Sequence, residues 1–181
     1  MIFTLLLSGC SDGFSKQKIC DNLCSHYTAT ASFIVSDGEN NVEGTADIIK
    51  SDLTTITFRK PDSFSGISIK GDSLGNPDVF SLELSGIPAK MPKSISGELS
   101  LIFSLFSDAV PSKIDALGKD AFSITSASNE LGNELIEVFF AENGMSYKIT
   151  YDKYSGIPYS LDAGNDKLSV SIILSDFTIS E

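Results

Sequence analysis

Apolar and polar residues alternate with a period of two along most of this chain, a pattern typical of half-buried β-strands. In the segment TATASFIV, for example, Ala31 and Phe33 share one face, and in LTTITFR so do Thr54, Ile56 and Phe58. Turns rich in Gly, Asn and Asp separate the segments, so we expect consecutive strands to pair antiparallel. The expected strands are 28–35, 41–50, 53–59, 65–71, 75–86, 121–128, 133–144, 145–152, 157–164 and 167–180.

The last of these strands changes the parity of its apolar residues. Up to Leu174 they are in phase with Leu168, whereas Phe177 and Ile179 have the opposite parity. One extra residue in a strand produces such a shift and bends the sheet. We therefore expect a β-bulge near Ser175-Asp176.

The segment SISGELSLIFSLFSDAVPSKIDALG, residues 94–118, interrupts the strands with a helical pattern. Leu101 and Leu105 form one apolar stripe, and Phe103 lies between it and the main stripe. A helix that is apolar on most sides must be enclosed or must face an apolar ligand, so Leu101, Phe103 and Leu105 are the candidate ligand-binding residues. We expect Pro111 to end this helix, and residues 112–117 are compatible with a further turn that Gly118 ends. The main stripe consists of Ile95, Leu99, Ile102, Phe106 and Val110.

A shorter helical pattern precedes the first strand. In KICDNLCS, the residues Ile19, Cys20, Leu23 and Cys24 recur at helical spacing, which predicts an N-terminal helix. Cysteines four residues apart on a helix meet the geometry of a disulfide only with strain, so we interpret both as small apolar residues. A disulfide between them stays the alternative, because disulfides persist outside the cytoplasm.

Size and charge restrict the class of protein. At 181 residues the chain is long enough for one domain with a substantial core. Its net charge is −11, with 13 Lys and Arg against 24 Asp and Glu. A chain this acidic would be repelled by a phosphate backbone, so nucleic acid is excluded as a partner.

Residues for catalysis or metal binding are scarce. His26 is the single histidine, which argues against a Ser-His-Asp triad and a His-rich zinc site, and we expect it at the surface. The acidic pairs Asp37/Glu39 and Asp162/Asp166 lie in turn-like sequences without the spacing of a calcium loop, so we expect solvated turns. The sequence therefore predicts no enzyme, no cofactor and no metal site.

The N-terminus carries a short apolar run, Ile2–Leu7, that is too short to span a membrane. The following Leu7-Ser8-Gly9-Cys10 resembles the lipobox of bacterial lipoproteins. This resemblance implies a signal peptide at 1–9, diacylglycerol on the Cys10 thiol and a lipidated tether at 10–13. The mature protein would then be anchored on the extracytoplasmic face of the cell membrane.

Two points qualify this interpretation of the N-terminus. Residues 1–4 include no Lys or Arg, so we expect the true start codon to lie upstream and the signal peptide to be truncated. The alternative is that the apolar run is a buried first strand.

The order of elements resembles the bacterial lipoprotein-carrier superfamily that includes LolA, LolB and LppX-type proteins. The shared features are a lipobox, a helix leading into the strand 28–35, antiparallel strands broken by a central helix, and a closing strand with the motif Ser175-Asp176-Phe177. The resemblance implies that residues 14–181 form one domain, mainly β with few helices (α+β). Its single, strongly curved antiparallel sheet would be an incomplete barrel, covered on its concave face by the N-terminal and central helices.

Two functional hypotheses follow. In the first, the protein is a membrane-anchored carrier that binds a lipid or another hydrophobic ligand in the cavity of the half-barrel. In the second, it is an interaction module of the envelope that docks another protein and binds no small molecule. The central helix separates the two, because its second stripe either faces a void of a few hundred cubic ångströms or packs into a filled core.

Overall fold

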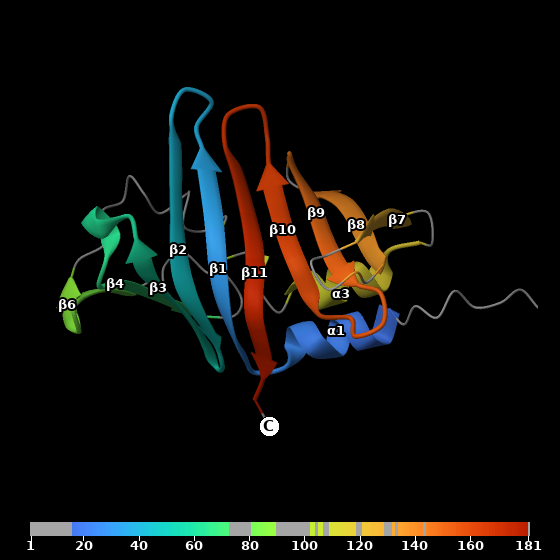
Figure 1. The fold of residues 1–181 in the computed structure, drawn as a ribbon, viewed down its shortest axis with the longest axis horizontal. Coiled ribbons are helices and arrows are strands. Elements are labelled where there is room, and N and C mark those ends of the chain that lie inside the picture. Colours follow the sequence, from blue (N-terminus) through green and yellow to red (C-terminus); the bar gives the residue numbers. More distant parts are fainter. Residues whose placement is uncertain are drawn as a thin grey trace, which may run out of the picture.

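A computed structural model describes residues 16–72, 81–89, 102–103, 105–106, 109–118, 121–128, 132, 134–142 and 144–180. This part of the chain is mainly β and forms one open antiparallel sheet with two α-helices (Figure 1). The helices are α1 Lys16–Cys24, the 3-10 helix η1 Asp62–Phe64 and α3 Ala109–Ala116. The strands are β1 Tyr27–Ser36, β2 Asn41–Lys50, β3 Leu53–Lys60, β4 Ile67–Asp72, β5 Ser81–Leu84, β6 Ile87–Ala89, β7 Phe122–Ser128, β8 Glu134–Glu142, β9 Met145–Asp152, β10 Pro158–Gly164 and β11 Ser169–Ile179.

The sheet has eleven strands in the order β6-β5-β4-β3-β2-β1-β11-β10-β9-β8-β7. All neighbours pair antiparallel. For strands that follow one another along the chain this was predicted from the short turns, whereas the pairing of β1 with β11 was not. Strands β1 and β11, from opposite ends of the chain, lie side by side at the centre (Figure 1). This central pairing of the first and last strands joins the two halves of the sheet.

The expected β-bulge is present in β11. Thr28 of β1 pairs with Thr178, but Thr30 pairs with Ser175, so β11 contains one extra residue between these partners. Asp176 lies in this interval with a φ of 51°, a left-handed conformation. The parity shift in the sequence therefore located the bulge correctly.

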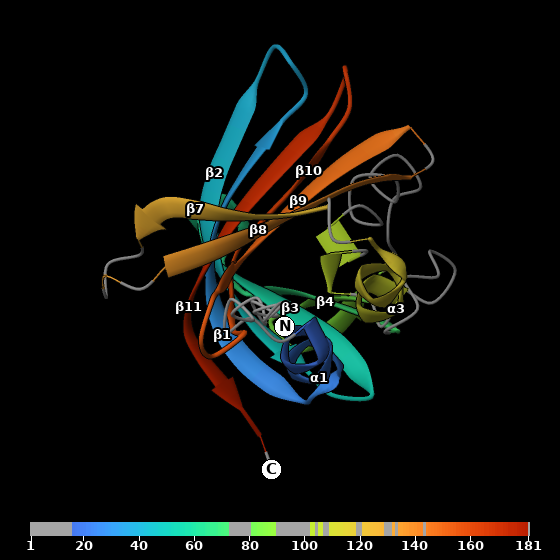
Figure 2. The ribbon, with the colours of Figure 1, turned by 90° about the vertical axis from the view of Figure 1, so that its right-hand side faces the viewer.

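One face of the sheet is buried together with both helices. Tyr27 and Ala31 of β1 are 1% and 2% exposed, and they belong to one hydrophobic core with Ile19 of α1 and Ile114 of α3. Figure 2 shows α1 and α3 on the same side of the sheet. The alternate residues of the same strands, such as Ile34, point to the other face and are exposed.

Helix α1 is fixed to both the sheet and α3. The Lys16 Nζ donates hydrogen bonds to the carbonyls of Asp115 and Leu117 at the C-terminal end of α3, where the helix dipole favours a positive charge. The Asn22 Nδ2 donates to the Ser155 carbonyl in the turn between β9 and β10, at 2.9 Å. These contacts position α1 across one end of the sheet.

Several local expectations need correction. Pro111 does not end a helix but lies in the first turn of α3, where its missing N–H has no intrahelical partner to lose. Cys20 is buried as expected, whereas Cys24 is exposed, and the two form no disulfide. Asp162 lies within β10, in agreement with the predicted strand 157–164 and not with the turn expected for the pair Asp162/Asp166. Strand β6 was not expected, because its three residues, Ile87–Ala89, are too few to show a period.

Of the central segment, Ile102, Phe103 and Leu105 are helical, in agreement with the predicted helix. In the described part of the chain, no helix has the length and apolar character needed to cross a bilayer.

Candidate functional site

The candidate site is the apolar space between the central segment and the buried face of the sheet. Ile102 and Phe106 contribute from the central segment, and the sheet contributes from β1, β2, β3 and β11. Only about 20 Å³ of this space is empty, close to the minimum that holds one water molecule. Because the surrounding side chains are all hydrocarbon, the space offers water no partner. The sheet residues that line it are Ala31, Phe33, Ala46, Ile48, Ile56, Phe58, Val170 and Ile172.

The described residues of the central segment that follow Ile102 are buried against the sheet. Phe103 and Phe106 are each 2% exposed and Leu105 is fully buried, so all three belong to the core. Phe106, from the main stripe, lines the remaining space, and Phe103 does not. Leu101, the other candidate from the sequence, lies outside the described residues. A ligand role of Leu101, Phe103 and Leu105 stays a prediction.

Aromatic rings crowd the end of this space near the turn after β3. The rings of Phe33 and Phe58 meet edge to face at 5.5 Å between centroids, and Phe58 contacts Phe64 in the same way at 6.0 Å. Edge-to-face pairs of this kind are favourable beyond the area that they bury. Three aromatic rings are therefore in contact at this end of the apolar face.

The opposite end of the same face, beside α1, carries polar residues. Tyr27, Lys50 and Thr54 are register partners across β1, β2 and β3, and they are 1%, 3% and 1% exposed. The Lys50 Nζ donates a 2.5 Å hydrogen bond to the carbonyl of Leu23 in the last turn of α1 and lies 5.9 Å from the centre of the Tyr27 ring. A buried ammonium group is stabilised by both contacts.

Two hydroxyl groups in the buried core have no hydrogen-bond partner among the described residues. They are Thr54 Oγ1 and Tyr151 Oη. Burial raises the pKa of the Tyr151 hydroxyl well above its usual range, so this group stays a neutral donor. Unpartnered buried hydroxyls are costly and rare in folded proteins. The polar end was not foreseen from the sequence, although the period of two placed Thr54 on the apolar face.

Described residues form two open grooves on the exposed face of the sheet. One, of about 490 Å³, runs over β1, β2 and β11, where Ile34 and Ile173 are 44% and 49% exposed. The other, of about 600 Å³, includes Lys148 and Asp162, whose charged atoms are 3.5 Å apart. Both grooves are shallow surfaces for contact rather than enclosed pockets.

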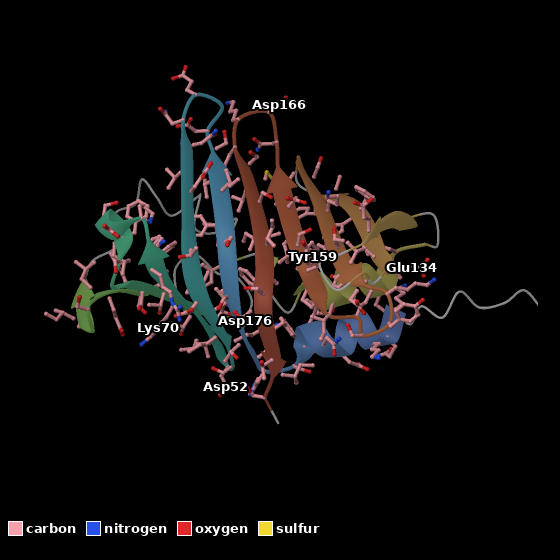
Figure 3. The ribbon with its side chains drawn as sticks, in the orientation of Figure 1. Asp52, Lys70, Glu134, Tyr159, Asp166 and Asp176 are labelled. Carbon is pink, nitrogen blue, oxygen red and sulfur yellow. The ribbon has the colours of Figure 1, made fainter. Side chains whose placement is uncertain are left out.

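Charged groups of the described residues lie at several separate places on the molecule. His26 is exposed, as expected, with its Nε2 3.8 Å from a carboxylate oxygen of Asp52. Asp37 is a turn residue, as expected, and hydrogen bonds from the backbone N–H groups of Asn40 and Glu39 lower the pKa of its carboxyl. Figure 3 shows Asp52 and Asp166 at opposite ends of the sheet. No cluster of three or more His, Cys, Asp or Glu residues suited to a metal ion occurs within the described ranges.

Comparisons with known proteins identify the fold. No protein-family model matches the chain, and no curated protein matches it in sequence. Among solved structures, the chain is similar to an uncharacterized conserved protein from Thermus thermophilus. The TM-score is 0.52 at 11% identity, and the match covers 91% of this chain and 85% of that chain.

Two further likenesses are weaker. A LolA superfamily protein from Nitrosomonas europaea matches with a TM-score of 0.40 at 7% identity, over 92% of this chain and 94% of that chain. LprF from Mycobacterium bovis matches with a TM-score of 0.44 at 10% identity, over 92% and 96% of the two chains. At these TM-scores the two likenesses carry no argument about function. LolA superfamily proteins thus occur among the solved structures that match the chain. The acylation of Cys10 stays a prediction.

Proposed function

We propose that this protein binds a lipid or another hydrophobic ligand between the sheet and the central segment. In this proposal the sheet is an incomplete barrel, and α1 and the central segment cover its inner face. The single observation that carries the proposal is the wholly apolar lining formed by residues such as Ala46, Ile48 and Ile172. An aliphatic chain transferred from water to such a surface gains about 0.8 kcal/mol for each buried methylene group.

Binding must displace part of the central segment. The 20 Å³ that is empty cannot hold an acyl chain, so the ligand takes the place of Ile102 and Phe106. The alanines at 31 and 46 then matter, because small side chains on the sheet leave depth for a chain once the segment moves. In this proposal, ligand binding is therefore coupled to movement of the central segment.

Binding of a fluorescent fatty-acid probe tests this proposal. We expect saturable binding to the full chain, and we expect Ala31→Leu to weaken it about tenfold because the added carbons occupy the lining. Ser32→Leu is the matched control, since it places the same side chain on the exposed face of the same strand. Titration by fluorescence, with circular dichroism to verify folding, measures both variants. Absence of saturable binding to the parent protein would refute the proposed function.

We further propose that the protein acts on the extracytoplasmic face of the membrane, anchored through Cys10. Cys10 lies outside the described residues, and the lipobox resemblance supports this part of the proposal. We expect Cys10→Ser to move the protein from the membrane fraction to the soluble fraction of the cell. Fractionation and immunoblotting measure this shift. Retention of the Cys10→Ser protein in the membrane fraction would contradict the anchor.

Docking of an envelope protein is the second candidate function. The exposed apolar residues Ile34 and Ile173 beside the groove on β1, β2 and β11 favour it. This function needs no interior ligand, so it gains support if the fatty-acid probe does not bind. Neither candidate includes a catalytic step, and the absence of enzymatic activity stays a prediction.

A further inference from the structure

We propose that the polar end of the buried face, formed by Lys50 and Thr54, binds the anionic head group of an aliphatic amphiphile. The chain of this ligand lies over Ile48 and Ile56 and extends toward Phe33. This inference rests on the proposed function, and it assigns the chemical class and the orientation of the ligand.

The register of β2 and β3 places the polar pair directly next to the apolar lining. Lys50 pairs with Thr54, and Ile48 pairs with Ile56. Both pairs are on the buried face, one inward-facing position apart, which is about 7 Å along a strand. Because Ile48 and Ile56 line the apolar space, a chain that lies on them ends at Lys50 and Thr54.

The Thr54 hydroxyl is the observation that indicates a missing partner. The side chain belongs to a residue that is 1% exposed, and its oxygen has no hydrogen-bond partner in the described part of the protein. A valine would fill the same space as this threonine on the apolar face. The unpartnered hydroxyl therefore destabilises the folded protein without improving its packing. A ligand oxygen that accepts a hydrogen bond from Thr54 removes this cost.

The neighbouring charge selects the head group. Lys50 is 3% exposed, and in so buried a position an ammonium group interacts with an anion much more strongly than it does in water. A carboxylate or a phosphate accepts hydrogen bonds and carries the complementary charge, whereas an ester supplies only the acceptor. The net charge of −11 disfavours anions at the surface in general, so the preference must come from this local site.

Competition against the bound fatty-acid probe tests the inference. The competitors are palmitate, palmitoyl lysophosphatidic acid and methyl palmitate, which share one chain and differ in the head group. We expect at least one of the two anionic ligands to bind the full-length protein about tenfold more tightly than methyl palmitate. The anionic ligand that binds more tightly shows whether the site prefers a carboxylate or a phosphate head group.

Two variants and two matched controls localise the effect. We expect Thr54→Val and Lys50→Met each to reduce the preference for the anion to about threefold or less, with the affinity for methyl palmitate unchanged. Thr55→Val and Lys70→Met repeat the same changes on the other face of β3 and β4, and we expect them to keep the preference of the parent protein. If Lys50→Met does not fold, because it loses the bond to Leu23, Thr54→Val still decides the result.

The outcomes distinguish this inference from the proposed function. Binding of all three competitors with equal affinity overturns the head-group site and leaves the proposed function intact. An equal loss of preference in the variants and in their controls also overturns the site, because the preference then does not depend on Lys50 and Thr54. Failure of every ligand to bind the parent protein overturns both.

Discussion

Gly44→Ala is expected to lower the free energy of unfolding by about 3 kcal/mol, the upper end of the usual cost of overpacking. A Cβ atom at this position would lie 2.2 Å from the Lys60 carbonyl oxygen and 2.5 Å from the tip of the Phe33 ring. The first neighbour is backbone, and the second is a core side chain in edge-to-face contact with Phe58. Neither group can move away without disturbing β3 or the contact between Phe33 and Phe58. Urea denaturation measures the change.

Gly118→Ala is the matched control for this substitution. A Cβ atom at Gly118 would have no neighbour within 4 Å, and Gly118 is not among the glycines with positive φ. We expect its effect to stay within about 0.5 kcal/mol, as for most surface substitutions. Equal stability of Gly44→Ala and Gly118→Ala would show that β2 and β3 are not held as closely as the structure has them.

The strands could be predicted from the sequence because each of them has its own local pattern. The alternation in 28–35 and 53–59 assigned Phe33, Thr54 and Ile56 to the buried face, and the structure confirms this assignment. Even the bulge was predictable, since an extra residue must reverse the parity that follows it. Such alternation patterns lie within a few residues of the chain, so they can be recognised without knowledge of the fold.

Features that depend on distant contacts could not be predicted in this way. Lys50 ends a strand, where a lysine is ordinarily solvated, and it is buried because the carbonyl of Leu23 in α1 accepts its hydrogen bond. Asp162 lies within the predicted strand 157–164, but the 2.6 Å hydrogen bond that it accepts from Ser171 of β11 depends on the pairing of β10 with β11. In both cases the partner is set by packing or by strand pairing.

The burial of the central segment was predictable, but the side chain that borders the remaining space was not. The helical pattern of the central segment indicated that its apolar surface is enclosed, and the burial of Phe103, Leu105 and Phe106 agrees. Which of these side chains borders the remaining space depends on how the segment is rotated about its axis. Helical spacing leaves this rotation open, so the sequence favoured Phe103 where the structure has Phe106 beside the cavity.

Phe106→Ala is expected to lower the free energy of unfolding by about 3–5 kcal/mol and to strengthen binding of the fatty-acid probe. The stability falls because the ring is 2% exposed and packs in the core. Binding improves because the lost ring enlarges the existing space of about 20 Å³, so a ligand has less of the central segment to displace. Urea denaturation and probe titration measure the two effects, and Phe106→Leu is expected to show both at smaller size.

Phe103→Ala is the control variant for Phe106→Ala. Phe103 is equally buried, so we expect a similar loss of stability, but it does not line the space and its removal should leave probe affinity close to that of the parent protein. A gain in affinity that is confined to Phe106→Ala therefore separates a wider binding space from a generally loosened core. If both variants gain the same probe affinity over the parent protein, destabilisation alone accounts for the gain. The site between Phe106 and the sheet then loses its support.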